Sequence, residues 1–556
     1  MKKSKFNAFN KILKNTPLKK VFDKYYIPEN KIIAFFKAVQ RNSTLLENIV
    51  QFLKNELSGV NNFYTEEFLV VLLTFRSFFQ INTNHLVEAI KAQENPLLTS
   101  FFKTLTPVID ISKDHLNKIK RLLSPIKEEF INCVLKIEED YIRIQQEDLP
   151  NYYREMKAQI GTELVPSASK ILELVPWRLY FKDQIFDWDS YYSPILMYKV
   201  FVWSRLKKLD GCIKIRNEIH SEIESTNGHF HKVGQILGFV KNVPGKTKLY
   251  TFFYQLDQDI LYKTIETQAR LLMKRNDAAH IILTVDSSSL KAKANDPSLS
   301  EDTKENSNRK KTHKIHAVCD GLGIPLQIYR TQGEMNDMKG FELYKENLIR
   351  LKKIADDENI PIIGLAIDAG FASKDNINWI KNVLGVTPVP WPRNPRGGEL
   401  SWLIHWLNNL RKRLKRLIKL KRDTSPDKIL EDKVYCNIIK AIETICRELQ
   451  GSKSEYARLI ASLLLEIGIH KWFSIYRRRA TIEGTFGIWK SSYHLLKRTP
   501  SQSLPVIGAE NIKKHTALVV IAMQINALYR YLMVQSDTGI LKPSLAFRIK
   551  ELELDL

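Results

Sequence analysis

The chain has 556 residues, 44% of them hydrophobic, and a formal net charge of +24. So many apolar side chains can form sizeable cores, which excludes a globally disordered chain, and the length suggests several domains. The positive charge indicates a polyanionic partner, with nucleic acid ahead of an anionic membrane surface.

Several classes of protein are disfavoured by what the chain lacks. No uninterrupted apolar run is long enough for a membrane-spanning helix, and the basic N-terminus lacks the apolar stretch of a secretory signal. The five cysteines are scattered without a Cys-x-x-Cys pair, which argues against a disulfide framework or a zinc finger and fits a reducing cytoplasm. No membrane is therefore expected as a partner.

The first region, 1–275, is predicted to be mainly helical, with a possible division into two subdomains near 150–180. Its clearest helix is Glu66 to Phe79, and a long helix is predicted from Lys248 to Lys274. Short helices joined by tight turns are compatible with a helix-turn-helix DNA reader, and equally with an ordinary helical bundle.

The pattern changes at residue 281, and the region 276–391 is predicted to be a mixed α/β layer. Apolar and β-branched runs predict strands at 281–285, 313–319, 325–331, 362–367 and 387–389, with helices from Asp337 to about Ala355 and from Ser373 to Leu384. The second and third strands are joined by Asp320-Gly321, a hairpin signal. The order β-β-β-α-β-α-β predicts a hairpin-led sheet with helical crossovers.

The region 392–470 is interpreted as an all-helical insertion. Its first helix has leucines on one face and a cluster of basic residues on the other. That cluster comprises Arg411, Lys412, Arg413, Lys415, Arg416 and Lys419. A charged face is often merely solvated, but this density favours contact with DNA phosphates.

Three carboxylates form the candidate catalytic constellation. Asp286 and Asp368 are each predicted at the end of a buried strand, where an Asp alone is often only a turn or cap residue. Tyr476 to Lys497 is predicted to be one helix, on which Tyr476, Arg479, Glu483 and Lys490 fall within an arc of about 60°. Three carboxylates can hold two divalent metal ions for phosphoryl transfer, with the phenol and the two cations gripping DNA phosphates.

The spacing Tyr476-x(2)-Arg479-x(3)-Glu483-x(6)-Lys490 resembles the Y-(2)-R-(3)-E-(6)-K signature of one group of insertion-sequence DDE transposases. The segments TVDSSSL around Asp286, KTHKIHAV in the hairpin and AIDAGFAS around Asp368 also resemble motifs of that group. The resemblance covers about 281–391 and 470–535. Phe371 stands where the group commonly has Tyr.

The resemblance implies an RNase H-like catalytic core in two parts, 276–391 and 471–556, separated by the insertion, with 1–275 binding the element ends. It implies catalysis by Asp286, Asp368 and Glu483 with two Mg²⁺ ions, for which Mn²⁺ is expected to substitute. The DNA ends would be cut and their 3′ hydroxyls joined to target DNA, in a homodimer on paired ends. It also implies a prokaryotic, cytoplasmic, nucleoid-associated protein without a small-molecule substrate.

Some assignments stay open at this point. The resemblance makes Trp391, Trp402 and Trp406 candidates for stacking on a flipped base, although burial in the helical bundle is the simpler expectation. His313 and His316 are expected to be structural. The helix from Asn511 to Met533 can serve as core or as a dimer surface. Two other functions compete: a domesticated DNA-binding protein without catalysis, and an RNase H-like nuclease that cuts without joining.

Overall fold

The computed structural model describes most of the chain, in segments separated by short gaps, and divides it into two compact units, Met1–Ile260 and Leu261–Leu556. The described residues are 27, 29–58, 64–91, 102–103, 105–106, 111–147, 171–187, 192–209, 211–224, 230–239, 242–274, 281–291, 296–298, 312–332, 337–393, 398–420, 431–491, 495 and 505–535.

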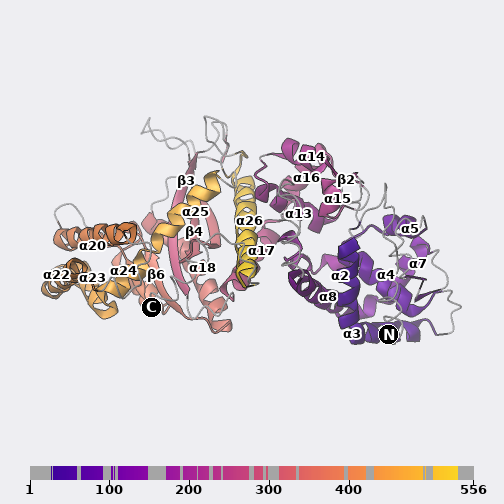
Figure 1. The fold of residues 1–556 in the computed structure, drawn as a ribbon, viewed down its shortest axis with the longest axis horizontal. Helices are drawn as coiled ribbons and strands as arrows, with labels where there is room; N and C mark the ends of the chain where they lie inside the picture. The colour runs from indigo at the N-terminus through magenta and orange to yellow at the C-terminus, as the bar shows by residue number, and fades with distance from the viewer. Residues whose placement is uncertain are drawn as a thin grey trace. The chain divides into compact units, whose positions relative to one another are not determined.

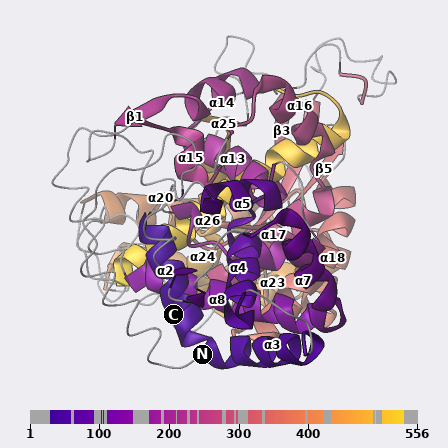
Figure 2. The ribbon, with the colours of Figure 1, turned by 90° about the vertical axis from the view of Figure 1, so that its right-hand side faces the viewer.

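The first unit is built mainly of helices around an apolar core rich in phenylalanine (Figure 2). The predicted helix from Glu66 to Phe79 is present as α4, and nearly all of it is buried. The unit contains α2 Glu29–Arg41, α3 Ser43–Glu56, α4 Glu66–Phe79, α5 Thr83–Lys91, α7 Lys113–Leu122, η1 Ser124–Ile126, α8 Lys127–Glu147, α11 Trp177–Tyr180, α12 Gln184–Asp187, α13 Pro194–Leu206, α14 Cys212–Ile219, β1 Glu222–Glu224, β2 Phe230–Lys232, α15 Val233–Leu237 and α16 Lys246–Gln255.

The prediction of one long helix from Lys248 to Lys274 is wrong, because two helices occupy that stretch. The second helix, α17 (Gln258–Met273), begins after a break at Leu256 and Asp257. Asp257 Oδ1 accepts a hydrogen bond of 2.8 Å from the Asp259 amide. An Asp that satisfies an otherwise unpaired amide at a helix start favours a new helix over continuation of the first.

A mixed five-stranded sheet forms the centre of the second unit, as predicted. Its order is β5-β4-β3-β6-β7, with β3 in the middle. β4 pairs antiparallel with β3 and β5, whereas β6 runs parallel to β3 and β7 runs parallel to β6. The bounds are β3 Ile281–Lys291, β4 Thr312–Asp320, β5 Pro325–Gln332, β6 Ile362–Ile367 and β7 Pro388–Pro390.

Two helices link the parallel strands, as the chain order predicted. α18 (Asp337–Asp357) joins β5 to β6, and α19 (Lys374–Asn382) joins β6 to β7. Ser373 caps α19 by accepting a hydrogen bond of 3.1 Å from the Asn376 amide. Figure 1 shows β3, β4 and β6 with α25 (Arg479–Ser491) crossing near β3.

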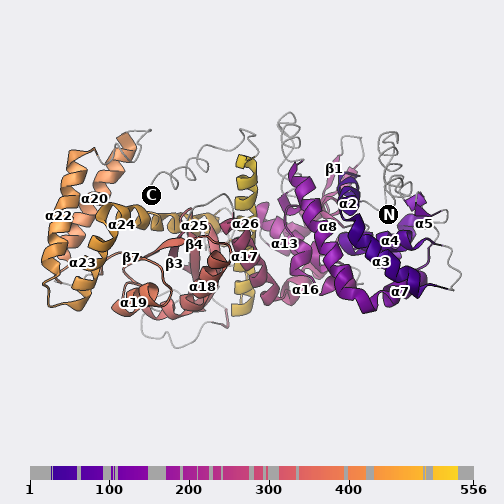
Figure 3. The same cartoon turned by 90° about the horizontal axis from the view of Figure 1, so that it is seen from below.

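The insertion is helical and shares its core with the sheet. It comprises α20 (Ser401–Leu420), α22 (Lys433–Leu449) and α23 (Glu455–Ile467), followed by α24 (Ile469–Tyr476), as Figure 3 shows. The leucine face of α20 and the apolar face of α22 belong to the same buried cluster as β3 and β6. The insertion reaches the sheet through α23 and α24, which contact β6 and β7, while α20 packs against α22.

The C-terminal helix α26 (Ala509–Gln535) is a core element over its described side chains. Leu518, Val519, Val520 and Ile521 are each at most 1% exposed. Gln524, also buried, donates hydrogen bonds to backbone carbonyls of Ile265 and Pro325. This burial favours the core role over the dimer surface that the sequence left open.

Within the described segments, no single helix is long and apolar enough to cross a bilayer. One pair of helices reaches that length only together, across a bend of 98° between Glu455–Ile467 and Ile469–Lys490.

Candidate active site

Asp286 and Asp368 lie side by side on neighbouring parallel strands. The last paired residues of β3 and β6 are Thr284 and Ala366, each two positions before its Asp. Asp368 directly follows β6, as predicted, but Asp286 lies inside β3, which continues to Lys291. The prediction that the first strand ends at Asp286 is wrong because the polar residues after it pair with the hairpin strand β4.

Glu483 is brought to these two carboxylates by α25, and one guanidinium contacts all three. Arg479 Nη2 lies 3.0 Å from Asp286 Oδ2 and 3.1 Å from Asp368 Oδ2, while Nη1 lies 2.9 Å from Glu483 Oε1. The side chain of Arg479 is 14% exposed, as is that of Asp286, whereas Glu483 is 58% exposed. The three acids thus converge around one cation at the edge of the sheet.

Burial and charge set the protonation of this cluster. Burial raises the pKa of Asp286 to about 6, against the opposing charge of Arg479, and Asp368 and Glu483 add to the rise. For Arg479, burial alone would lower the pKa, but the surrounding acids, Asp286 first, raise it above its ordinary value. The guanidinium therefore stays charged, and Asp286 is protonated more easily than an ordinary Asp.

The four signature residues do not lie on one continuous helix, so that prediction is wrong. Tyr476 is the last residue of α24, and Arg479 is the first of α25. Between them the amides of Arg478, Ala480 and Thr481 bond three residues back instead of four, which is the tighter 3₁₀ pattern. The predicted extension to Lys497 also fails, because α25 ends at Ser491.

The apolar face of α25 fixes the direction of its polar face. Ile482 and Trp489 are completely buried and Phe486 is 6% exposed. Trp489 Nε1 also donates a hydrogen bond to Met523 Sδ on α26 at 2.9 Å. With these side chains in the core, Arg479 and Glu483 are presented to the strands.

Lys490 reaches the site from the far end of α25. Its Nζ lies 2.7 Å from Ser288 Oγ, and Ser288 is two positions beyond Asp286 on β3. Residues two apart on a strand share a face, so Lys490 lies beside the acids as the spacing predicted. Burial lowers the pKa of Lys490.

Tyr476 is held in an aromatic stack beside the acids. Its ring lies 5.3 Å from Trp472 in a stacked arrangement and 4.9 Å from Trp391. Burial raises the pKa of Tyr476, while the charges of Arg479 and, more weakly, Arg411 oppose that rise. Arg411 of the insertion is therefore near the site, which the sequence did not predict.

The insertion tryptophans differ from one another. Trp391 and Trp406 are partly buried against the core, as expected. Trp402, at the start of α20, is 70% exposed, so the expectation of burial is wrong for it. It lies one residue before Leu403, the first leucine of the buried face, and its ring is 6.1 Å from that of His405.

The basic face of α20 is exposed at four of its predicted positions: Arg411, Lys412, Lys415 and Arg416. Arg413 differs because it pairs with Asp432, the residue that caps α22, at 3.1 and 2.5 Å. This pair joins α20 to the start of α22. Arg413 therefore has a structural partner within the insertion. Lys419 belongs to α20, and its side chain lies outside the described residues.

A buried polar cluster near the hairpin was missed in the sequence. His313 and Asp296 are joined at 3.0 Å, and Arg330 Nε lies 3.0 Å from His313 Nδ1. His313 and His316 are both fully buried, consistent with the structural role expected of them. No periodicity links Asp296, His313 and Arg330, and only the folding of β4 against β5 shows them as neighbours.

The three carboxylates have the chemistry of a site for hard divalent cations. Each directs one oxygen toward the same guanidinium, and carboxylate oxygens are the ligands that Mg²⁺ and Mn²⁺ prefer. Yet among the residues that the structure describes, no three Asp, Glu, His or Cys side chains are spaced to hold an ion. The Arg479 guanidinium contacts one oxygen of each of the three acids.

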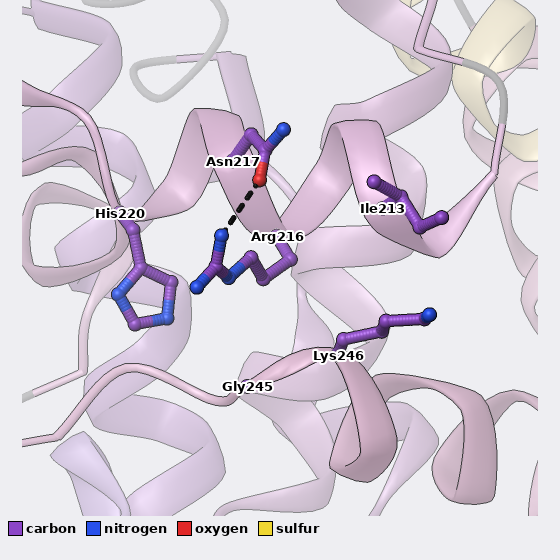
Figure 4. A pocket seen from close by; sticks show the side chains of 6 residues that line it. All are labelled: Ile213, Arg216, Asn217, His220, Gly245 and Lys246. Carbon is purple, nitrogen blue, oxygen red and sulfur yellow. Dashed lines mark hydrogen bonds between the residues drawn. The ribbon is translucent and has the colours of Figure 1, made fainter.

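A second surface feature belongs to the first unit. A hollow of about 300 Å³ is lined by Ile213, Arg216, Asn217, His220, Gly245 and Lys246 (Figure 4). Arg216 and His220 come from the end of α14, and Lys246 begins α16 after Gly245, which offers no side-chain cap. Burial lowers the pKa of His220. The lining has two cations and no acid, so it suits an anion.

Comparison with known families identifies the second unit. Residues 277–519 match the family model described as Transposase DDE domain. The matched stretch contains all three carboxylates, Arg479, Lys490 and the helical insertion. No curated protein and no solved structure was found to match the chain.

Proposed function

We propose that this chain, which belongs to the DDE transposases through residues 277–519, cuts the ends of its mobile element and joins them to target DNA. The observation that carries the proposal is the convergence of Asp286, Asp368 and Glu483 on one cationic group. These residues are up to 197 positions apart in sequence. A purely structural carboxylate would not need two further acids beside it.

The fold and the donor set support this proposal. The sheet order, with Asp286 on the central strand and Asp368 after its parallel neighbour, is the order expected of an RNase H-like core. Asp286, Asp368 and Glu483 would hold two Mg²⁺ ions, with Mn²⁺ as a substitute. When bound, such ions activate an attacking oxygen and stabilise the leaving 3′ oxygen.

The chain's own cations would hold the substrate. Arg479 suits bidentate contact with a phosphate, and Lys490 beside Ser288 supplies a second positive charge at the strand. Tyr476, fixed between Trp391 and Trp472, closes one side of the site. These groups would orient the scissile phosphate for in-line attack, first by water and then by the 3′ hydroxyl.

DNA outside the active site would be bound by two other surfaces. We assign 1–275 to recognition of the element ends, and the basic hollow beside α16 supports this by offering two cations to a backbone phosphate. The exposed basic residues of α20 would track target or flanking DNA. Because two ends are cut and joined together, we propose a homodimer on paired ends.

Replacement of one acid tests the proposal. Asp368→Asn should abolish Mg²⁺-dependent cleavage of a terminal DNA fragment, while affinity for that fragment stays within about twofold. Asp375→Asn, in the first turn of α19 and exposed, is the matched control and should cleave normally. Normal cleavage by Asp368→Asn would refute the site assignment.

The competing functions are separated by the products of the same assay. A nuclease that cuts without joining would release 3′ ends that never appear covalently linked to target DNA. A domesticated DNA-binding protein would bind the ends without cutting them. The presence of all three carboxylates disfavours the DNA-binding protein without catalysis. The Tyr476, Arg479, Glu483 and Lys490 spacing and the large helical N-terminal region favour a transposase over a nuclease that only cuts.

A further inference from the structure

Arg479 occupies the position that a metal ion needs. Its two terminal nitrogens contact one oxygen from each acid at 2.9 to 3.1 Å. A guanidinium has no lone pair to offer a metal, and a like charge beside Mg²⁺ is unfavourable. A metal ion held by the same three oxygens would therefore lie against the charge of Arg479, and the two cations would compete for the carboxylates.

Asp286 has one oxygen, Oδ2, for which Arg479 and a metal ion would compete. Its Oδ1 accepts a hydrogen bond of 2.8 Å from the Ser287 amide, and its Oδ2 accepts from Arg479. Mg²⁺ binds oxygen at about 2.0–2.1 Å, roughly 1 Å closer than the guanidinium nitrogens. A divalent ion held by Asp286 Oδ2 would therefore favour withdrawal of Arg479 from that oxygen.

The guanidinium is also incompletely satisfied where it lies. Arg479 Nε is buried without a hydrogen-bond partner among the described residues. A buried donor left unpaired destabilises the state that contains it. A phosphate oxygen is a strong acceptor for a guanidinium, so DNA offers Arg479 a partner that the free protein does not.

From these contacts we propose that Arg479 is an exchangeable counter-ion, which blocks the metal site in the free protein and moves to a DNA phosphate when substrate binds. The inference rests on the proposed function, since it takes the three acids as the metal ligands. It goes further in making metal loading depend on DNA. By linkage, DNA and the divalent ion then strengthen each other's binding by one common factor.

Metal binding without catalysis tests this. Binding of Mn²⁺ to the full-length chain is measured by calorimetry and by its electron paramagnetic resonance signal, first without DNA. Arg479→Ala should bind Mn²⁺ at least about tenfold more tightly than the natural chain, within the range of ordinary coupling. Arg479→Lys keeps a positive charge but loses the two-nitrogen guanidinium. Its Mn²⁺ affinity should lie between those of Arg479→Ala and the natural chain.

DNA supplies the second arm of the test. A terminal DNA fragment should tighten Mn²⁺ binding by the natural chain and have little effect on Arg479→Ala. Arg350→Ala is the matched control, because it removes another arginine that pairs with a glutamate four positions away, on α18. It should bind Mn²⁺ as the natural chain does, with and without DNA.

Each outcome is informative. Equal Mn²⁺ affinity of Arg479→Ala and the natural chain, with both folded by thermal melting, overturns the inference. So does an equal effect of DNA on the two proteins. If Asp368→Asn leaves Mn²⁺ binding unchanged, the acids are not the ligands and the proposed function itself fails, which is a distinct result.

Discussion

Gly323 and Thr485 fix helix α25 to the hairpin, because Thr485 Oγ1 donates a hydrogen bond of 2.5 Å to the Gly323 carbonyl. The two residues are 162 positions apart and lie on the β4–β5 turn and on α25. Gly323 has φ +81°, and a Cβ there would lie 2.7 Å from Thr485 Oγ1 and 2.9 Å from the Thr481 carbonyl. Only glycine allows this approach, which places Glu483 beside the strands.

Gly323→Ala should therefore displace α25. We expect a loss of about 1–3 kcal/mol in the free energy of unfolding and a fall in cleavage of at least about tenfold. Chemical denaturation and a cleavage assay measure the two effects. Gly385→Ala is the control, since Gly385 also has positive φ but meets nothing within 4 Å; an equal loss of cleavage in both variants would contradict the role of close packing.

The exposed basic face of α20 should contribute affinity without sequence preference. Replacing Lys412, Lys415 and Arg416 together by Ala should weaken binding to all DNA sequences alike. The slope of log affinity against log salt should fall by about 0.9 for each phosphate that the variant no longer neutralises. Fluorescence anisotropy over a range of salt concentrations measures it, and an unchanged slope would mean that this face is only solvated.

Arg413 provides a contrast on the same helix. Because it pairs with the carboxylate that caps α22, Arg413→Ala should lower the free energy of unfolding, partly through the weakened cap. Its salt slope for DNA should stay close to that of the natural chain. A reduced slope with unchanged stability would place Arg413 on DNA instead.

Stability in acid should depend on Asp296. Burial would raise its pKa, but hydrogen bonds from Ser298, His313 and the Gly508 amide outweigh burial and lower the pKa to about 2. An unfolded Asp has a pKa near 3.9, so this stabilisation is complete above about pH 4 and disappears as the pH falls toward 2.

Asp296→Asn should therefore be less stable than the natural chain at pH 7, by on the order of 2 kcal/mol. The difference between the two proteins should shrink below pH 4. Urea unfolding at pH 7, 4 and 3 follows it, with Asp375→Asn as a surface control. A constant difference at all three values would show that the charge of Asp296 is not responsible.

The basic hollow of the first unit should matter for element ends. Replacing Arg216 and Lys246 together by Ala should weaken binding of a terminal DNA fragment by about tenfold or more, because two cations that neutralise backbone phosphates are removed. Lys54→Ala, on the exposed face of α3, should have little effect. Unchanged DNA affinity of the double variant would show that the hollow does not bind DNA.

The sequence alone predicted the strands and their order along the chain, because these depend on local patterns. It also named Asp286, Asp368 and Glu483, which the structure brings to one guanidinium. Apolar β-branched runs set the strands of the sheet, and Asp368 follows its strand as predicted. The spacing of Arg479, Glu483 and Lys490 survives as one face of α25. The spacing of residues along a helix or strand determines which side chains share a face. This depends only on residues close to one another in the chain.

Tertiary structure decided what those faces meet. Packing of Tyr476 against Trp391 and Trp472 accompanies a break before Arg479 that periodicity does not register. Contacts between residues 111 and 193 positions apart place the guanidinium among the acids. Such pairings depend on how distant elements pack, so only the folded chain shows that Arg479 occupies the place expected for a metal ion.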